Sequence, residues 1–167
     1  MRFTYCPACG TSLSSRILGD EGAIPWCDHC VRPWFDMFST CVIAAVVNEQ
    51  GEVSLLREAR DPSREVLVAG YIKPGESAEN AVRREIQEEL GLHAESLHLL
   101  GTTYHPKADQ LMVAFVVSVR KAPLILSYET QSAAWVKLEN AEQRVPPGSI
   151  ALQVVQSARA LFQEVIH

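Results

Sequence analysis

The 167-residue sequence lacks a long uncharged apolar run, a surplus of basic residues and any internal repeat. Its longest apolar run, Cys41 to Val47, has the length of a strand, whereas a membrane-spanning helix needs about 20 residues. The chain has 15 basic and 20 acidic residues and a net charge of −5, so it carries no overall basic surface for nucleic acid or anionic lipid. We therefore expect neither a membrane nor a nucleic acid as its partner.

An apolar stretch of signal-peptide length is also missing before the first cysteine. On this ground we expect a soluble protein of the cytoplasm. In a reducing compartment, closely spaced cysteines are more typical of metal sites than of disulfides. Hydrophobic residues make up 47% of the chain, and a chain of this length can bury about two thirds of its unfolded surface. A hydrophobic core without disulfides is therefore expected.

Four of the five cysteines form two C-x-x-C pairs, Cys6 with Cys9 and Cys27 with Cys30. Tetrahedral zinc takes four thiolates at about 2.3 Å, and two such pairs on facing hairpins supply them. The alternatives are a redox-active dithiol or two structural disulfides, but a redox C-x-x-C would be single and lie in a βαβ context. A shell of four thiolates leaves no position for a catalytic water, so the predicted zinc is structural.

The residues around these pairs have more than one interpretation. Gly10 follows the first pair and suits a turn that requires positive φ. His29 could replace a cysteine ligand, although four thiolates are already present. Trp26 and Trp34 could stack on a base or pack over the metal site. Cys41 lies in an apolar run, where a lone thiol is usually a small buried hydrophobe.

Composition changes after the turn-rich and cysteine-rich segment 1–34, which we predict to be a small zinc ribbon. Residues 35–167 are predicted to form an α+β domain. Strands are expected over 42–47, 53–56, 66–69, 97–103, 111–119 and 133–136, with a loop over 57–65. One helix is expected from the cap Ser77 to Gly91, and another after the turn 146–149.

Three carboxylates, Glu85, Glu88 and Glu89, lie along one border of the apolar stripe of the first predicted helix. Carboxylates at these spacings repel one another, and partial burial adds to the cost. Mg²⁺ or Mn²⁺, which prefers oxygen ligands, would compensate; the alternative is a solvated acidic face. Arg84 can bind a carboxylate through two hydrogen bonds, and Glu76 in the preceding loop is its candidate partner.

The whole spacing from Gly70 through Glu76 and Arg84-Glu85 to Gly91 resembles the signature of the Nudix hydrolases at every fixed position. The resemblance implies a Nudix fold, an α/β/α sandwich around a mixed sheet. It also implies Mg²⁺-dependent or Mn²⁺-dependent hydrolysis of a nucleoside diphosphate linked to another moiety, which yields a nucleoside monophosphate and a phosphorylated product. The substrate would be a small nucleotide, and a homodimer would be in keeping with the family.

The resemblance also assigns roles to individual residues. The cations would be held by Glu85, Glu88, Glu89 and the backbone carbonyl of Ala69, while Gly70, Gly75 and Gly91 shape the loops and Arg84 and Glu76 position the ligands. Bound cations would stabilise the charge on the pyrophosphate and orient a water, whose proton must pass to a carboxylate. Glu85 is one candidate base. Glu129 is the other, because it stands where the family has a late glutamate; its alternative role is a solvated loop acid. The predicted catalytic residues are thus Glu85, Glu129 and Arg84.

A zinc ribbon ahead of a Nudix domain resembles the NADH pyrophosphatases and a group of FAD and ADP-ribose pyrophosphatases. The chain keeps Pro106, Leu111, Met112 and Phe115 of the NADH group's signature but has other residues at Thr103, His105, Lys107 and Ala108, which argues against NADH. The segments 69–72, 75–77 and 146–147 resemble the second group and favour FAD, ADP-ribose or a related adenine dinucleotide. The candidate substrate contacts are Tyr71, Tyr104, His105 and Lys107, each with a structural or solvent-exposed role as its alternative. NADH hydrolysis and nucleotide sensing without catalysis remain the competing hypotheses.

Overall fold

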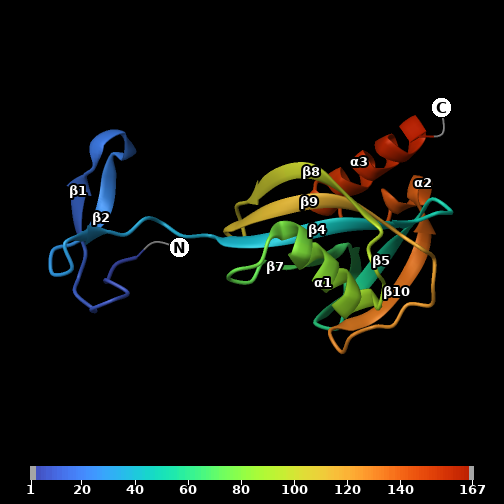
Figure 1. The fold of residues 1–167 in the computed structure, drawn as a ribbon, viewed down its shortest axis with the longest axis horizontal. Helices are drawn as coiled ribbons and strands as arrows, with labels where there is room; N and C mark the ends of the chain where they lie inside the picture. Colours follow the sequence, from blue (N-terminus) through green and yellow to red (C-terminus); the bar gives the residue numbers. More distant parts are fainter. Residues whose placement is uncertain (1–2, 166–167) are drawn as a thin grey trace. The chain divides into compact units, whose positions relative to one another are not determined.

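The computed structural model describes residues 3–165. The chain forms two compact units, one ending at Ser39 and the other beginning at Thr40. We call the first the cysteine unit and the second the sheet unit (Figure 1). None of the described helices is long and apolar enough to cross a membrane.

The cysteine unit contains a three-stranded antiparallel sheet in the order β1-β2-β3. Its elements are β1 (Ser14–Ile17), the 3₁₀ helix η1 (Gly19–Glu21), β2 (Ala23–Cys27) and β3 (Arg32–Pro33). The core is small: Cys6, Ile24 and Cys27 are its buried hydrophobic residues among those described. A unit with so little buried apolar surface needs an additional source of stability, such as a bound metal.

Both tryptophans of this unit pack against cationic side chains. The guanidinium of Arg16 lies 4.6 Å from the centre of the Trp26 ring, and that of Arg32 lies 4.4 Å from the centre of the Trp34 ring. Phe3 meets Trp34 edge to face, with ring centres 5.9 Å apart. The two rings therefore contribute to the packing of the unit, which is one of the two roles expected from the sequence.

The sheet unit is built on a seven-stranded sheet in the order β10-β5-β4-β9-β8, with β6 paired to β5 and β7 paired to β4. Its strands are β4 (Ser39–Asn48), β5 (Glu52–Glu58), β6 (Asp61–Val66), β7 (Val68–Tyr71), β8 (Ser96–His105), β9 (Gln110–Val119) and β10 (Thr130–Lys137). The helices are α1 (Ala78–Leu90), α2 (Leu138–Ala141) and α3 (Ile150–Val165). The predicted loop over 57–65 was wrong in part, because residues from Asp61 onward form β6.

The central strand β4 separates two hydrophobic cores. Its alternate residues Cys41, Ile43, Ala45 and Val47 belong to one core, which also contains residues of α3, while Val42, Ala44 and Val46 belong to the other, which contains residues of α1. Because successive side chains of a strand point to opposite faces, the two helices cover opposite sides of the sheet (Figure 1). The predicted sandwich and the buried position of Cys41 are confirmed.

The helix α1 begins and ends where the sequence predicts. The hydroxyl of Ser77 accepts a hydrogen bond of 3.2 Å from the amide of Asn80, and Gly91 adopts the left-handed conformation that closes the helix. A Cβ at Gly91 would stand 2.7 Å from Cβ of Ile125. The left-handed backbone and this short distance therefore both disfavour a side chain at this position. These caps fix the rotation and length of the helix that carries the three carboxylates.

Candidate functional site

The four sulfur atoms of Cys6, Cys9, Cys27 and Cys30 lie within 4.8 Å of one another. The Sγ atoms of Cys6 and Cys30 are 3.9 Å apart, and those of Cys9 and Cys27 are 3.6 Å apart. A disulfide would require about 2.05 Å, whereas a tetrahedral zinc with Zn–S distances of about 2.3 Å places its sulfurs about 3.8 Å apart. The cluster therefore has the dimensions of a tetrathiolate metal site and is compatible with a small zinc ribbon.

Two similar turns present these sulfurs. The amide of Cys30 donates to Sγ of Cys27 at 3.3 Å, the usual contact inside a metal-binding C-x-x-C turn. The residues that follow the two pairs, Gly10 and Val31, both have positive φ, +75° and +53°. Nδ1 of His29 lies 3.9 Å from Sγ of Cys30, and His29 is not part of the four-residue cluster.

The crowding of the four thiols has an electrostatic consequence. Neighbouring sulfurs, that of Cys9 first, raise the pKa of Cys30 to about 12. The contact with the Thr11 hydroxyl lowers the pKa of Cys9 to about 5. Like charges so close together cannot all form without a cation, so this geometry favours a bound divalent metal over four free thiolates.

In the sheet unit, Arg84 joins the loop before α1 to the helix itself. Its Nε and Nη2 donate to the two carboxylate oxygens of Glu76 at 2.8 and 2.9 Å, and Nη2 also donates to the carbonyl of Tyr71 at 2.9 Å. Its Nη1 donates to Glu85 at 2.6 Å and to Glu88 at 3.0 Å. The pairing of Arg84 with Glu76 expected from the sequence is present in the structure, and the guanidinium fixes two of the three helix carboxylates.

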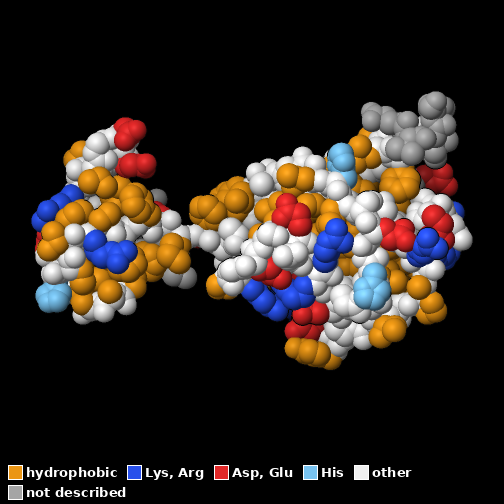
Figure 2. Space-filling model, viewed as in Figure 1, with side chains coloured by type: hydrophobic (Ala, Val, Ile, Leu, Met, Phe, Trp, Pro, Cys, Tyr) orange, Lys and Arg blue, Asp and Glu red, His pale blue; other side chains and the backbone are white. Residues whose placement is uncertain are grey.

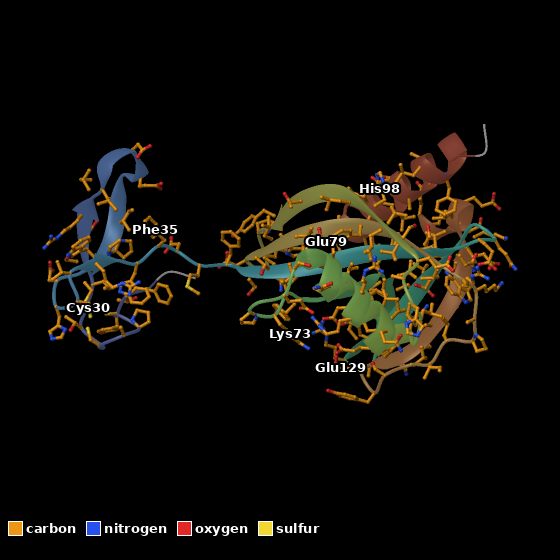
Figure 3. The ribbon with its side chains drawn as sticks, viewed as in Figure 1. Cys30, Phe35, Lys73, Glu79, His98 and Glu129 are labelled. Atoms are coloured by element: carbon orange, nitrogen blue, oxygen red, sulfur yellow. The ribbon has the colours of Figure 1, made fainter. Side chains whose placement is uncertain are left out.

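The carboxylates border a cavity of about 570 Å³, which we call the carboxylate cavity. The residues that line it include Glu58, Arg60, Ala69, Gly70, Tyr71, Lys73, Arg84, Glu85, Glu88, Glu89, Tyr128 and Glu129. They come from β5, β7, α1 and the segment before β10, and Figure 3 shows Lys73 and Glu129 near α1. The structure thus places Glu129 at the same cavity as the three helix carboxylates.

One glycine sets how closely the strand and the helix approach. A Cβ at Gly70 would overlap the carboxyl group of Glu85, so any side chain here would displace that carboxylate. The next residue back, Ala69, pairs with Ile43 across β7 and β4, which fixes the backbone beside Glu85. Of the two other glycines of the motif, Gly75 has φ +81° and Gly91 has φ +68°. Each of the three therefore occupies a position that disfavours a side chain.

The three helix carboxylates differ in charge compensation. Glu85 and Glu88 bind Arg84, and Nζ of Lys73 lies 3.9 Å from Glu88. None of the ion pairs found among residues 3–165 includes Glu89. Burial raises the pKa of Glu89 to about 8, and the nearby carboxylates Glu85 and Glu58 add to this effect. A further positive charge is therefore favourable beside Glu89.

The four candidate substrate residues Tyr71, Tyr104, His105 and Lys107 line a second cavity of about 840 Å³. This second cavity also contains Arg64 and the first residues of α3, and it shares Glu58, Arg60, Ala69, Gly70 and Tyr71 with the carboxylate cavity. The side-chain Nε2 of Gln110 donates to the hydroxyl of Tyr71 at 3.1 Å. Tyr71 is therefore held at the wall between the two cavities.

Sequence reasoning missed Glu58, Arg60, Arg64, Lys73 and Tyr128 as residues of the two cavities. Lys73 lies within the motif, so its positive charge and its position between Gly70 and Glu76 could have indicated that it lines the carboxylate cavity. The others lie outside any motif and reach the cavities through strand pairing and the loop before β10. The Tyr128 hydroxyl donates to Glu129 at 2.8 Å, a contact between adjacent residues that no sequence pattern predicts.

Comparison with known proteins identifies this architecture. The model of the NUDIX domain matches residues 37–153. The chain belongs to the NUDIX family. Its Nudix fold is shared with a NUDIX hydrolase from Nitrosomonas europaea (TM-score 0.68, 20% identity, 97% of this chain and 91% of the other covered). It is also shared with the NUDIX domain of Shewanella oneidensis NrtR, solved with ADP ribose (TM-score 0.66, 19% identity, 77% and 90% covered). The predicted Nudix fold is confirmed.

Curated relatives of this Nudix chain carry the name NAD-capped RNA hydrolase NudC. The protein from Photobacterium profundum is 25% identical over 166 residues, which are 98% of this chain and 61% of the relative. The protein from Klebsiella pneumoniae strain 342 is 24% identical over 158 residues, which are 94% and 60% of the two chains. The chain therefore spans about three fifths of the length of these relatives.

Proposed function

We propose that this Nudix chain is a divalent-cation-dependent pyrophosphohydrolase. It cleaves a nucleoside diphosphate linked to another moiety into a nucleoside monophosphate and a phosphorylated product. The observation that carries this proposal is the convergence of Glu85, Glu88, Glu89 and Glu129 on one cavity, with Arg84 holding the first two in place. Family membership supports the reaction class.

The donor set of the carboxylate cavity fits Mg²⁺ or Mn²⁺. Glu85, Glu88 and Glu89 supply carboxylate oxygens, and Ala69, whose backbone carbonyl is the fourth proposed ligand, lines the same cavity. A bound cation would neutralise pyrophosphate charge and lower the pKa of a bound water. The protein contributes position: Arg84 and Gly70 fix Glu85, so its carboxylate needs little rearrangement to act as a ligand.

Two carboxylates can receive the proton of the attacking water. Glu129 receives a hydrogen bond from Tyr128 and leaves its second oxygen available for a water. Burial raises the pKa of Glu85 above its usual range, while the hydrogen bond from Arg84 opposes that rise. Glu85 is also a proposed metal ligand, so a separate base at Glu129 divides the two tasks. Glu129→Gln with retained Mn²⁺ binding and slow hydrolysis would assign the base to Glu129.

We propose an adenine dinucleotide as the substrate class. The Tyr71 ring on the wall shared by the two cavities is placed to contact a base or ribose while the pyrophosphate lies by the carboxylates. The name of the curated relatives supports an NAD-type substrate, whereas residues 103–108 argue against NADH, and the segments 69–72, 75–77 and 146–147 favour FAD or ADP-ribose. NAD and FAD are adenine dinucleotides, and ADP-ribose contains the same adenosine diphosphate part.

We also propose that the cysteine unit binds one structural zinc ion through Cys6, Cys9, Cys27 and Cys30. The closed set of four sulfurs leaves no open coordination position for catalysis. The zinc-binding region would correspond to residues 1–34, and the remainder of the chain would carry the pyrophosphohydrolase site.

A substrate panel tests the proposed function. Purified protein is incubated with NADH, FAD, ADP-ribose and a dinucleoside polyphosphate, with Mg²⁺ or with excess chelator, and products are identified by mass spectrometry. We expect Mg²⁺-dependent release of AMP from at least one compound. Saturable nucleotide binding without cleavage of any member of the panel would instead indicate a nucleotide-sensing protein and contradict the proposal.

A further inference from the structure

We propose that the second cavity binds a phosphate group carried on a ribose of the substrate, outside the pyrophosphate that is cleaved. This inference rests on the proposed function, because it concerns the substrate of the same site. It predicts that nucleotides with a 2′-phosphate, a 3′-phosphate or a 3′-phosphodiester on the ribose are preferred over the same nucleotides without that group.

The two adjoining cavities have opposite charge. Among the residues that line the carboxylate cavity, five are glutamates and three are Lys or Arg. Among the described residues that line the second cavity, Glu58 is the only acid, and Arg60, Arg64 and Lys107 are the Lys or Arg residues. The carboxylate cavity thus suits cations bound to a pyrophosphate, whereas the second cavity suits an anion. Figure 2 shows acidic and basic side chains grouped side by side on the face of the sheet unit in view.

The three cations of the second cavity are not equivalent. Arg60 donates to both oxygens of Glu58, at 2.6 and 3.1 Å, so its charge is largely compensated. Arg64 pairs with Asp61 at 2.8 Å. Lys107 takes part in none of the ion pairs found in the described part of the chain. Its ammonium group is therefore the cation with the most charge left for a ligand.

His105 adds a second hydrogen-bond donor beside Lys107. The amide of Ala108 donates to Nδ1 of His105 at 3.1 Å, so the neutral ring carries its proton on Nε2. This bond also closes the turn that joins β8 to β9 and holds His105 and Lys107 on the same short turn. An N–H donor next to an ammonium group is a suitable pair of ligands for a phosphate.

The wall between the cavities relates this anion to the cleavage site. Ala69, Gly70 and Tyr71 line both cavities, so a ligand can extend from one to the other across the Tyr71 ring. A ribose phosphate is separated from the pyrophosphate of the same nucleotide by one sugar. A nucleoside that spans the wall therefore places its pyrophosphate by Glu85 and its second phosphate by Lys107.

Kinetic discrimination between matched substrates tests the proposal. The ratio of kcat/KM for NADPH over NADH, which differ by a 2′-phosphate, is measured in the wild type, in Lys107→Ala and in Arg120→Ala. Coenzyme A against dephospho-coenzyme A tests a 3′-phosphate, and a 5′-NAD-capped oligonucleotide against NAD tests a 3′-phosphodiester. Arg120 lines neither cavity, so its variant controls for the loss of one positive charge.

We expect at least one phosphorylated substrate to be preferred, and Lys107→Ala to reduce that preference about tenfold, the value of one charged hydrogen bond. Arg120→Ala leaves the ratio unchanged. Equal kcat/KM within every pair, or a Lys107→Ala variant that slows both members of a pair alike, would overturn the proposal while leaving pyrophosphate hydrolysis intact.

A binding measurement decides the matter independently of turnover. Adenosine 2′,5′-bisphosphate, adenosine 3′,5′-bisphosphate and AMP contain no pyrophosphate to cleave, and their dissociation constants are measured by calorimetry with Mg²⁺. We expect one bisphosphate to bind at least about tenfold more tightly than AMP, with this advantage lost in Lys107→Ala. Equal affinities would refute the phosphate site even if the substrate panel shows no hydrolysis, which would separately refute the proposed function.

Discussion

Gly70 is the residue at which the smallest change has the largest expected effect on the site. Because a Cβ would overlap the carboxyl group of Glu85, the substitution Gly70→Ala must displace a proposed metal ligand or the strand beside it. Displacements of about 1 Å at an active site can cost about 10²-fold in rate. We expect Gly70→Ala to lose activity on this scale while circular dichroism shows a folded protein. Full activity would show that Glu85 has no fixed role.

Val31 is an exposed β-branched residue held in the left-handed region, at φ +53°. Its counterpart after the first cysteine pair is Gly10, which adopts a similar φ without a side chain. The left-handed conformation costs a residue with a Cβ about 1–2 kcal/mol, although glycine also loses more entropy on folding. We expect Val31→Gly to retain zinc more strongly in competition with a chelator, by severalfold. Weaker retention would indicate that the Val31 side chain stabilises the turn.

At the scale of elements, Arg84 is the connection between the motif loop and α1. The pKa of Glu76 falls to about 2, chiefly through the hydrogen bonds from Arg84 and also through the amide of Lys73. Lysine has a single ammonium group and cannot reproduce five hydrogen bonds to three carboxylates and a carbonyl. We expect Arg84→Lys to lower both Tm and kcat/KM, the latter by about 10²-fold. Arg83→Lys, on the same helix, is the matched control.

A second ionic cluster joins the β4–β5 hairpin to the segment after β9 and to the last residue of β10. Glu52 accepts from Lys121 at 2.6 Å and from Asn48 at 2.9 Å, and it lies 3.6 Å from Lys137. Hydrogen bonding to Lys121, then to Asn48, lowers the pKa of Glu52 to about 2. Glu52 therefore stabilises the fold fully above its unfolded pKa of about 4.3, and this contribution is lost as pH falls through about 2.

The predicted pH dependence of this stabilisation is tested by urea unfolding of Glu52→Gln and the wild type between pH 7 and pH 3. We expect the variant to be less stable than the wild type at pH 7, with a difference that narrows below about pH 4. The difference should also shrink in high salt, because the lysines are partly exposed. A constant difference across this pH range would assign the effect to packing or to Asn48 instead of charge.

The same elements show what sequence can predict. The helix α1 was predicted to the residue because Ser77, an apolar stripe and Gly91 are local signals. The strand β6 was missed because Asp61 to Arg64 contains a proline and charged residues, and its order comes from pairing with β5. The motif predicted the contact between Arg84 and Glu76. It could not predict that Glu58 and Arg60 join the same cavities, since strand pairing brings them there.

At the scale of the whole molecule, the two units have separate sources of stability. The sheet unit has two large hydrophobic cores, whereas the cysteine unit has few buried apolar residues around its four sulfurs. We expect a strong chelator to unfold the cysteine unit, with a change in the fluorescence of Trp26 and Trp34, while the thermal transition of the sheet unit persists. Less than about one zinc ion per chain in the purified protein would contradict the tetrathiolate site.

The central claim is that the carboxylates of α1 are required for catalysis. Its most direct test compares two Glu→Gln substitutions on that helix. Glu88 lines the carboxylate cavity, whereas Glu79, labelled in Figure 3, lies in the first turn and outside the cavity. Mg²⁺-dependent release of AMP from the best substrate of the panel is measured for both variants. We expect Glu88→Gln to lose at least about 10²-fold in kcat and Glu79→Gln to match the wild type. Wild-type turnover by Glu88→Gln would contradict the account.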